Sequence, residues 1–225
     1  MELHESLIAC SRKDLGVRLA ETCKIDTYLI NYTLSTKADP SLVHPCHVES
    51  CADALRRLVK EQKAIKKLVL IGHSAGAHLA SLLVLDSTFA DLRPFILGVV
   101  GVQGIYDIPL LVATFGHIPM YQEFVRMAFS NDEQVWRDAS PINMRGSDSL
   151  PAFIIIHSLE DTLVDPQQAK SFHAHIVSCL SNPSSSNPRL PILRLDIGGS
   201  HDGIMHSQEL ATAIAEFTLP LLINT

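Results

Sequence analysis

Short, almost wholly apolar runs alternate along the chain with longer stretches in which apolar residues recur every three or four positions. The short runs are typical of strands that are buried on both faces of a parallel sheet. The periodic stretches are typical of helices that pack one face against such a sheet. The pattern therefore predicts an α/β fold, a mostly parallel sheet with helices on both faces.

Five short apolar runs are the predicted strands, and five periodic stretches are the main predicted helices. The strands are Thr27–Leu34, Lys67–Ile71, Phe95–Val102, Ala152–His157 and Ile192–Ile197. The helices are about Asp14–Cys23, about His47–Gln62, Ala75–Leu85, one that starts at Asp165-Pro166, and roughly Ser207–Phe217. A cluster of Ser, Asn and Pro over Ser181–Pro188 predicts a surface loop.

One long segment, Gly104–Leu150, interrupts this alternation and contains no strand-like run. Helical periodicity is present around Ile108–Thr114 and Met120–Phe129. We interpret the segment as a cap over the functional site. The length of 225 residues suits one domain, so residues 1–225 are interpreted as a single domain with residues 104–150 as a cap-like insertion.

Composition excludes several classes of protein. Apolar residues make up 47% of the chain and charged residues 19%, which is enough to build a core and argues against disorder. The net charge of −6 argues against a nucleic-acid partner. No apolar run reaches the roughly 20 residues that cross a bilayer, and the acidic start Met1–Glu5 does not resemble a signal peptide. Five scattered cysteines favour a reducing compartment, so we expect a cytoplasmic protein.

The sequence Gly72-His73-Ser74-Ala75-Gly76 lies between a predicted strand and a predicted helix. A Gly-x-Ser-x-Gly motif in this context is the nucleophile elbow of α/β-hydrolases. We expect the two glycines to let strand and helix approach closely. Ser74 Oγ would be exposed at the carboxyl edge of the sheet, and the Ala75 backbone N–H would point at the oxyanion. The alternative is a glycine-rich turn with an incidental serine.

A serine nucleophile needs a base. The chain has eleven histidines, so the candidate base is selected by its position in the chain. His201 follows the last predicted strand in Gly198–Asp202, at the edge where the serine is expected, and a solvated loop histidine is the alternative reading. His206 is the fallback. His73 is expected to point away from Ser74, and His78, one helical turn beyond it, is expected to pack or to support the site.

The acid should follow a strand and precede the histidine in the chain. Asp161 lies in the exit loop of Ala152–His157, and it would accept the Nδ1–H of His201 and hold its tautomer. Glu160 and Asp107 are the competing carboxylates. A metal cluster could be imagined at residues 44–51, which contain two histidines and two cysteines, but the apolar Cys51 face argues against it, so we expect no metal and no cofactor.

With these residues in place, the chain resembles a kynurenine formamidase (arylformamidase) of the fungal type, within the α/β-hydrolase superfamily. The resemblance lies in Leu58–Glu61, Gly72–Ala77, Gly104–Asp107, Arg126–Phe129, His157–Asp161 and Ser200–Asp202. It implies hydrolysis of N-formyl-L-kynurenine to L-kynurenine and formate in tryptophan breakdown and the route to NAD. It also implies that Ser74, Asp161 and His201 form the catalytic triad.

Aromatic residues of the predicted cap are candidates for packing on the substrate ring. Tyr106 is the substrate-binding candidate that we single out, together with Phe115, Tyr121 and Trp136. For each of them, ordinary core or cap packing is the alternative.

The chain departs from the family it resembles in one respect. The family carries a His-Gly-Gly-x-Trp motif after its third strand, which supplies the second oxyanion N–H, and this sequence contains no such motif. The family fold would therefore be N-terminally truncated here, through a truncated gene model or an alternative start. Either Thr27–Leu34 and Lys67–Ile71 pair directly, or a ladder stays open beside the nucleophile strand. One missing oxyanion donor lowers the rate about 10²- to 10³-fold, so we expect weak activity or none.

Two other functions remain open from the sequence. A small-substrate carboxylesterase would use the same three residues, and a non-catalytic relative would keep only the fold. In either enzymatic case the partner is a small molecule, N-formyl-L-kynurenine or a small ester. Nothing in the pattern decides between a monomer and a homodimer.

Overall fold

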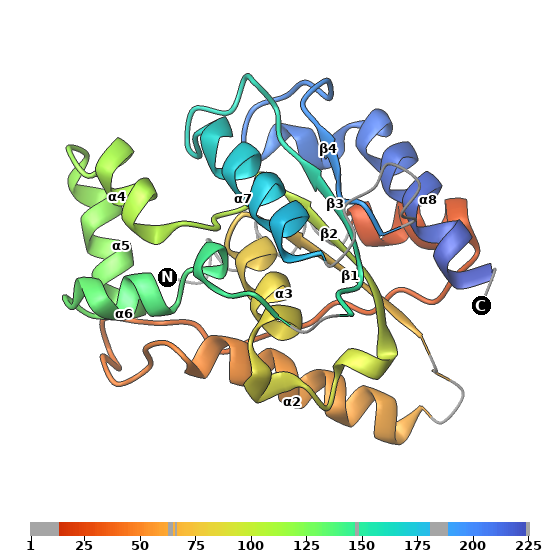
Figure 1. Cartoon of the computed structure of the whole chain (residues 1–225), viewed down its shortest axis with the longest axis horizontal. Coiled ribbons are helices and arrows are strands. Elements are labelled where there is room, and N and C mark those ends of the chain that lie inside the picture. Colours follow the sequence, from red (N-terminus) through yellow and green to blue (C-terminus); the bar gives the residue numbers. More distant parts are fainter. Residues whose placement is uncertain (1–13, 63–64, 66, 147–148, 181–188, 224–225) are drawn as a thin grey trace.

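A computed structural model describes residues 14–62, 65, 67–146, 149–180 and 189–223. At its centre four parallel strands form a sheet in the order β1-β2-β3-β4 (Figure 1). Their bounds are β1 Leu68–His73, β2 Ile96–Val102, β3 Ala152–Ile156 and β4 Ile192–Arg194. The predicted loop over residues 181–188 lies outside the described residues.

Helices cover both faces of this sheet (Figure 1). One face carries α2 (Cys46–Glu61), α3 (Ala75–Leu85) and α7 (Pro166–Cys179), and the other carries the helix over residues 14–23 and α8 (Gln208–Ile223). Successive strand residues supply the two cores in turn, because side chains of a strand alternate between its faces. Along β3, for example, Phe153 and Ile155 join the first core, and Ile154 and Ile156 join the second. The predicted fold class, a parallel α/β sheet with helices on both faces, is confirmed.

Three helices form a separate layer near the carboxyl ends of the strands. They are α4 (Ile108–Phe115), α5 (Pro119–Phe129) and α6 (Glu133–Asp138), and Figure 1 shows them together at one side of the sheet. Their apolar side chains share a small core of their own, which includes Ile108, Leu111, Tyr121 and Val125. The sequence predicted α4 and α5 but not α6, whose six residues are too few to show a helical period.

The predicted strand Thr27–Leu34 is wrong, because residues 26–36 carry no strand in the structure. A strand needs a neighbour to hydrogen-bond, and among the described strands β1 pairs only with β2. The ladder beside β1 is therefore open, which is the second of the two predicted arrangements. Ile71 on this edge is 38% exposed, and Leu29 and Leu34 are 57% and 46% exposed.

Smaller differences concern the ends of elements. β4 stops at Arg194 although the apolar run continues to Ile197, and α8 extends to Ile223, beyond the predicted end at Phe217. Short 3₁₀ turns complete the described elements, at Ser87–Phe89, Arg93–Phe95, Pro141–Asn143 and, as η4, Gly203–His206. None of the helices in the described ranges has both the length and the apolar character needed to cross a bilayer.

Candidate active site

Ser74 lies at the junction between β1 and α3, in a backbone conformation that is rare for a residue with a side chain. Its φ is 53° and its ψ is −119°, and its N–H donates a hydrogen bond of 2.9 Å to the carbonyl of Val102 at the end of β2. Such strain persists only where the surrounding structure enforces it, and it clusters at active sites. The serine is partly exposed. This is the geometry expected of a nucleophile elbow.

Only one of the two elbow glycines is required by packing. A Cβ on Gly72 would lie 2.3 Å from the carbonyl carbon and oxygen of Gly76, so only glycine lets the strand pass this close to the helix. A Cβ on Gly76 would meet nothing within 4 Å. The expectation that both glycines are needed is therefore wrong for Gly76. The close approach requires only that residue 72 has no side chain.

Asp161 and His201, 40 residues apart, meet at the carboxyl edge of the sheet. His201 Nδ1 donates to Asp161 Oδ2 over 2.8 Å, and the side chains are 10% and 0% exposed. Asp161 Oδ1 accepts the backbone N–H groups of Leu163 and Val164 at 2.8 and 3.1 Å. Burial alone would raise the pKa of Asp161, but these hydrogen bonds, first that of His201, hold the pKa below its usual value. The carboxylate is thus ionised and fixes the His201 tautomer.

The competing residues have other partners or other surroundings. Asp107 caps α4, with its Oδ1 accepting the Leu110 N–H at 2.9 Å. Glu160 and His206 are exposed. The structure therefore brings together Asp161 and His201, the two residues that the sequence favoured as acid and base.

Ser74 Oγ makes no hydrogen bond to His201 among the described residues, so the serine and the histidine are joined only indirectly. The link is His73, whose Nε2–H donates to the His201 carbonyl over 2.8 Å. The two imidazole rings are 4.6 Å apart between centroids. The His201 loop is thereby held against His73, the residue that precedes Ser74. Sequence reasoning missed this contact, because a bond to a backbone carbonyl leaves no pattern in the sequence.

Two further residues support the acid and base loops. His157 is fully buried, its Nε2–H donates to the Val164 carbonyl at 2.9 Å, and the same nitrogen lies 3.6 Å from Asp161 Oδ2. Arg18 donates to the carbonyls of Met205, His206 and Ser207 at 2.6 to 3.3 Å, and so ties the helix over residues 14–23 to the segment after His201.

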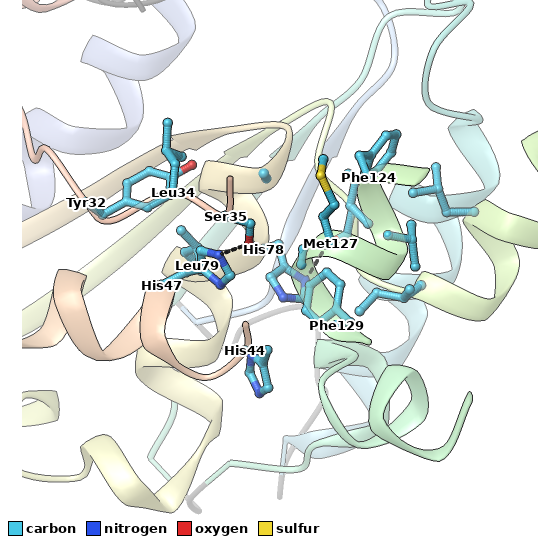
Figure 2. A pocket seen from close by; sticks show the side chains of 16 residues that line it. Tyr32, Leu34, Ser35, His44, His47, His78, Leu79, Phe124, Met127 and Phe129 are labelled. Atoms are coloured by element: carbon cyan, nitrogen blue, oxygen red, sulfur yellow. Dashed lines mark hydrogen bonds between the residues drawn. The ribbon is translucent and has the colours of Figure 1, made fainter. Parts of the chain in front are cut away.

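A pocket of about 250 Å³ opens beside Ala75, the residue that follows Ser74. Its walls come from α3, α4, α5, the start of α2 and the segment over residues 26–36 (Figure 2). The aromatic side chains of Tyr32, Phe124 and Phe129 contribute to the lining, and no Asp, Glu, Lys or Arg does. The arrangement places an uncharged, mostly apolar space next to the strained serine.

Comparison with known families decides the relationship of this chain. The family model BD-FAE matches residues 26–176, which include the elbow and Asp161. The chain belongs to the BD-FAE family. It is a kynurenine formamidase-like α/β-hydrolase, as the resemblance in its motifs predicted.

Curated relatives of this BD-FAE chain include fungal proteins. It is 28% identical over 167 residues to the kynurenine formamidase-like hydrolase fscH of Fusarium equiseti, 64% of this chain but only 55% of that protein's length. It is 29% identical over 208 residues to the kynurenine formamidase avaC of Aspergillus versicolor, 80% of this chain and 70% of the relative. The kynurenine formamidase of Eremothecium gossypii is 28% identical over 217 residues, 89% and 82% of the two chains.

Solved structures similar to the BD-FAE chain include esterases. Carboxyl esterase 2 from Tuber melanosporum superposes with a TM-score of 0.69 at 19% identity, covering 94% of this chain and 71% of the esterase. A hyperthermophilic esterase from the archaeon Pyrobaculum calidifontis gives a TM-score of 0.71 at 17% identity, covering 93% and 70%. At these identities the likeness establishes the α/β-hydrolase fold.

Three histidines contribute to the pocket of the BD-FAE chain, and all three have a pKa below the usual value. Burial is the main cause for His44, His47 and His78, and for His78 it lowers the pKa to about 3. His47 Nε2 lies 2.8 Å from Ser35 Oγ (Figure 2). His78 was expected to pack or to support the site, and it lines the pocket itself.

The four aromatic residues predicted to pack on the substrate ring do not line the pocket. Tyr106 is fully buried in the core, where its ring stacks on Phe172 at 4.0 Å between centroids, and it is not part of the pocket lining. We assign it packing instead of substrate binding. Phe115, Tyr121 and Trp136 belong to the core of α4, α5 and α6 and do not line the pocket either. Helical periodicity could not show that Phe124 and Phe129 line the pocket, because spacing along α5 does not tell which part of the chain packs against each face.

Cysteines and metal-ligand types give no further site within the described ranges. No group of three or more His, Cys, Asp or Glu there is placed to hold a metal ion. The thiols of Cys23, Cys46, Cys51 and Cys179 are free, and burial raises the pKa of Cys51 to about 12, so this thiol stays protonated.

Proposed function

We propose that the chain is a serine hydrolase that cleaves the formamide bond of N-formyl-L-kynurenine to give L-kynurenine and formate. Ser74 is the nucleophile, His201 the general base and Asp161 the group that orients the base. The observation that carries this proposal is the buried 2.8 Å hydrogen bond between His201 and Asp161 beside a strained serine. The printed names of the fungal relatives support the choice of substrate.

The reaction is an acyl transfer through a formyl-serine ester. Ser74 Oγ attacks the formyl carbon while His201 takes its proton, and the Ala75 N–H donates to the oxyanion. His201 then gives the proton to the aniline nitrogen, which leaves as the amine. Water, activated by His201, attacks the ester and releases formate. Asp161 accepts the Nδ1–H throughout and stabilises the imidazolium.

In this mechanism the oxyanion has one identified donor, the Ala75 N–H. The sequence contains no His-Gly-Gly-x-Trp motif to supply a second N–H donor. Removal of one such donor lowers the rate of related enzymes about 10²- to 10³-fold. We therefore expect hydrolysis slower by this factor than in an enzyme that has both donors.

Labelling with a fluorophosphonate probe tests the nucleophile. The unsubstituted chain is expected to become labelled, Ser74→Ala is not, and Ser171→Ala on α7 serves as the matched control that keeps its label. Hydrolysis of N-formyl-L-kynurenine, followed by release of formate, then tests the substrate. Absence of label from all three chains would instead favour a non-catalytic relative.

Hydrolysis of small esters is the second candidate function, and the pocket favours it. N-formyl-L-kynurenine carries an ammonium and a carboxylate group, whereas no charged side chain lines the pocket beside Ala75. Turnover of p-nitrophenyl acetate and of N-formyl-L-kynurenine by the same preparation separates the two functions. A kcat/KM at least tenfold higher for the ester, abolished by Ser74→Ala, would assign the chain to the esterases.

A further inference from the structure

Two residues that line the pocket beside Ala75, His44 and His78, each have a buried ring nitrogen whose role nothing in the proposed triad explains, and that of His78 carries the inference. His78 is 3% exposed, and its Nε2 has no hydrogen-bond partner in the described part of the chain. A buried polar group without a partner is costly, and native structures keep few of them. An unpaired nitrogen on the wall of a pocket next to a nucleophile therefore points to a ligand that pairs with it.

The hydrogen bonding of the other ring nitrogen decides what this ligand must offer. His78 Nδ1 lies 3.2 Å from the carbonyl oxygen of Ile105, and since a carbonyl can only accept, Nδ1 carries the proton. Burial lowers the pKa of His78 to about 3, so the ring is neutral in ordinary buffers. Nε2 is then a lone-pair acceptor, and the ligand must bring a donor.

The walls of the pocket decide the rest of the ligand's chemistry. The Phe129 ring packs edge-on against His78, with 5.5 Å between the centroids, and Figure 2 shows Phe124 and Met127 across the pocket from His47. A cavity of 150 Å³ already holds benzene, so the volume of about 250 Å³ is sufficient for a substituted aromatic ring. Without a charged residue in the lining, a buried charge on the ligand would be unpaired.

We propose that this pocket is a subsite for an uncharged arylamine, whose N–H donates to His78 Nε2. The inference rests on the proposed function, because the amine that leaves an aryl formamide is such a group. It adds that the ring enters the pocket between α3 and α5 and that a charged end of a substrate stays outside. The pocket then discriminates by one hydrogen bond and by the absence of charge.

Binding of three small aromatic probes to Ser74→Ala tests the subsite without turnover. At pH 7, 2-aminoacetophenone offers an uncharged amine, acetophenone has the same ring and ketone without a donor, and anthranilate carries a carboxylate. Dissociation constants from calorimetry or ligand-observed NMR are expected to be about tenfold lower for 2-aminoacetophenone than for acetophenone. Anthranilate is expected to bind at least tenfold more weakly than 2-aminoacetophenone.

Substitution of His78 locates the discrimination. Ser74→Ala combined with His78→Phe keeps an aromatic ring but removes the acceptor, so the tenfold preference for the amine should disappear. His78→Gln retains an acceptor oxygen and should recover part of it. The matched control is His173→Phe, which replaces a histidine outside the pocket that bonds a backbone carbonyl as His78 does, but through its Nε2, to Pro191 at 3.0 Å.

Three results would overturn the subsite. They are equal affinity for the two ketones, no binding of any probe up to the solubility limit, and a preference for the amine that survives His78→Phe. The probe comparison needs no substitution at His78, so it decides the matter even where that variant does not fold. If the probes are discriminated as expected but the unsubstituted chain is not labelled by the fluorophosphonate, the subsite is supported and the proposed hydrolase function is rejected.

Discussion

Single residues act in this site through the pairing of buried polar atoms. The carboxylate of Asp161 accepts hydrogen bonds from one imidazole and two backbone N–H groups, and His73 holds the His201 backbone from the other side. The two backbone bonds hold the carboxylate in place, and the bonds from Asp161 and His73 hold the ring and the backbone of His201. In the proposed mechanism, the reactivity of Ser74 therefore depends on residues that do not touch the substrate.

Asp161→Asn is expected to lower the rate of fluorophosphonate labelling and the kcat for N-formyl-L-kynurenine about 10³- to 10⁴-fold. The amide can present its NH₂ to Nδ1, which favours the tautomer with the proton on Nε2, and that nitrogen can then no longer act as a base. Glu160→Gln, on the exposed neighbouring carboxylate, is the control and should leave both rates unchanged. Equal losses in the two variants would show that Asp161 does not orient the base.

At the scale of elements, the elbow depends on how closely β1 approaches α3. The approach is possible because Gly72 has no side chain, and the backbone of Gly76 lies where a Cβ of residue 72 would be. The other side of β1 is an open ladder among the described strands, so the strand is held mainly by β2 and by α3. The position of Ser74 is therefore especially sensitive to this one glycine.

Gly72→Ala is expected to lower the free energy of unfolding by about 1–3 kcal/mol or more, because the new methyl group meets rigid backbone. The matched substitution Gly76→Ala adds the same methyl group into open space within a helix and should raise the free energy of unfolding by up to about 1 kcal/mol. Urea unfolding of both variants measures the difference. Similar stability of the two variants would contradict the packing described for the elbow.

For the whole molecule, the buried histidines couple stability to pH. Burial is the main cause that lowers the pKa of His44, His47, His78 and His157 in the folded chain. Below the unfolded pKa of about 6.5 the unfolded chain binds protons that the folded chain does not, so stability falls as pH falls. Asp161, whose folded pKa is lowered, loses its stabilising contribution only at more acidic pH, below about 4.

The free energy of unfolding is therefore expected to decrease between pH 7 and pH 5. His78 alone, with a folded pKa of about 3, contributes up to about 2 kcal/mol of this decrease. Urea unfolding at the two pH values measures it, and His78→Phe should reduce the dependence by that amount, whereas His206→Gln, on an exposed histidine, serves as the control. A His78→Phe variant with the full pH dependence would contradict the neutral, buried state of this ring.

Apolar periodicity determined the four parallel strands and most of the helices, because burial on one or two faces leaves a regular spacing in the chain. The same rules placed Ser74, Asp161 and His201 at strand ends. They failed at Thr27–Leu34, where a strand-like run has no described neighbour to pair with. They also failed at Tyr106, and they gave no signal for the place of Phe124 in the pocket or for the contact of His73, because these surroundings come from residues distant in sequence.

Only the tertiary structure decided which side chains line the pocket and which buried nitrogen atoms have no partner in the described part of the chain. Spacing along one element says which residues share a face, but not what the chain brings against that face. Hydrogen bonds between His201 and Asp161, or between His73 and a carbonyl 128 residues away, depend on packing of the whole sheet and its loops.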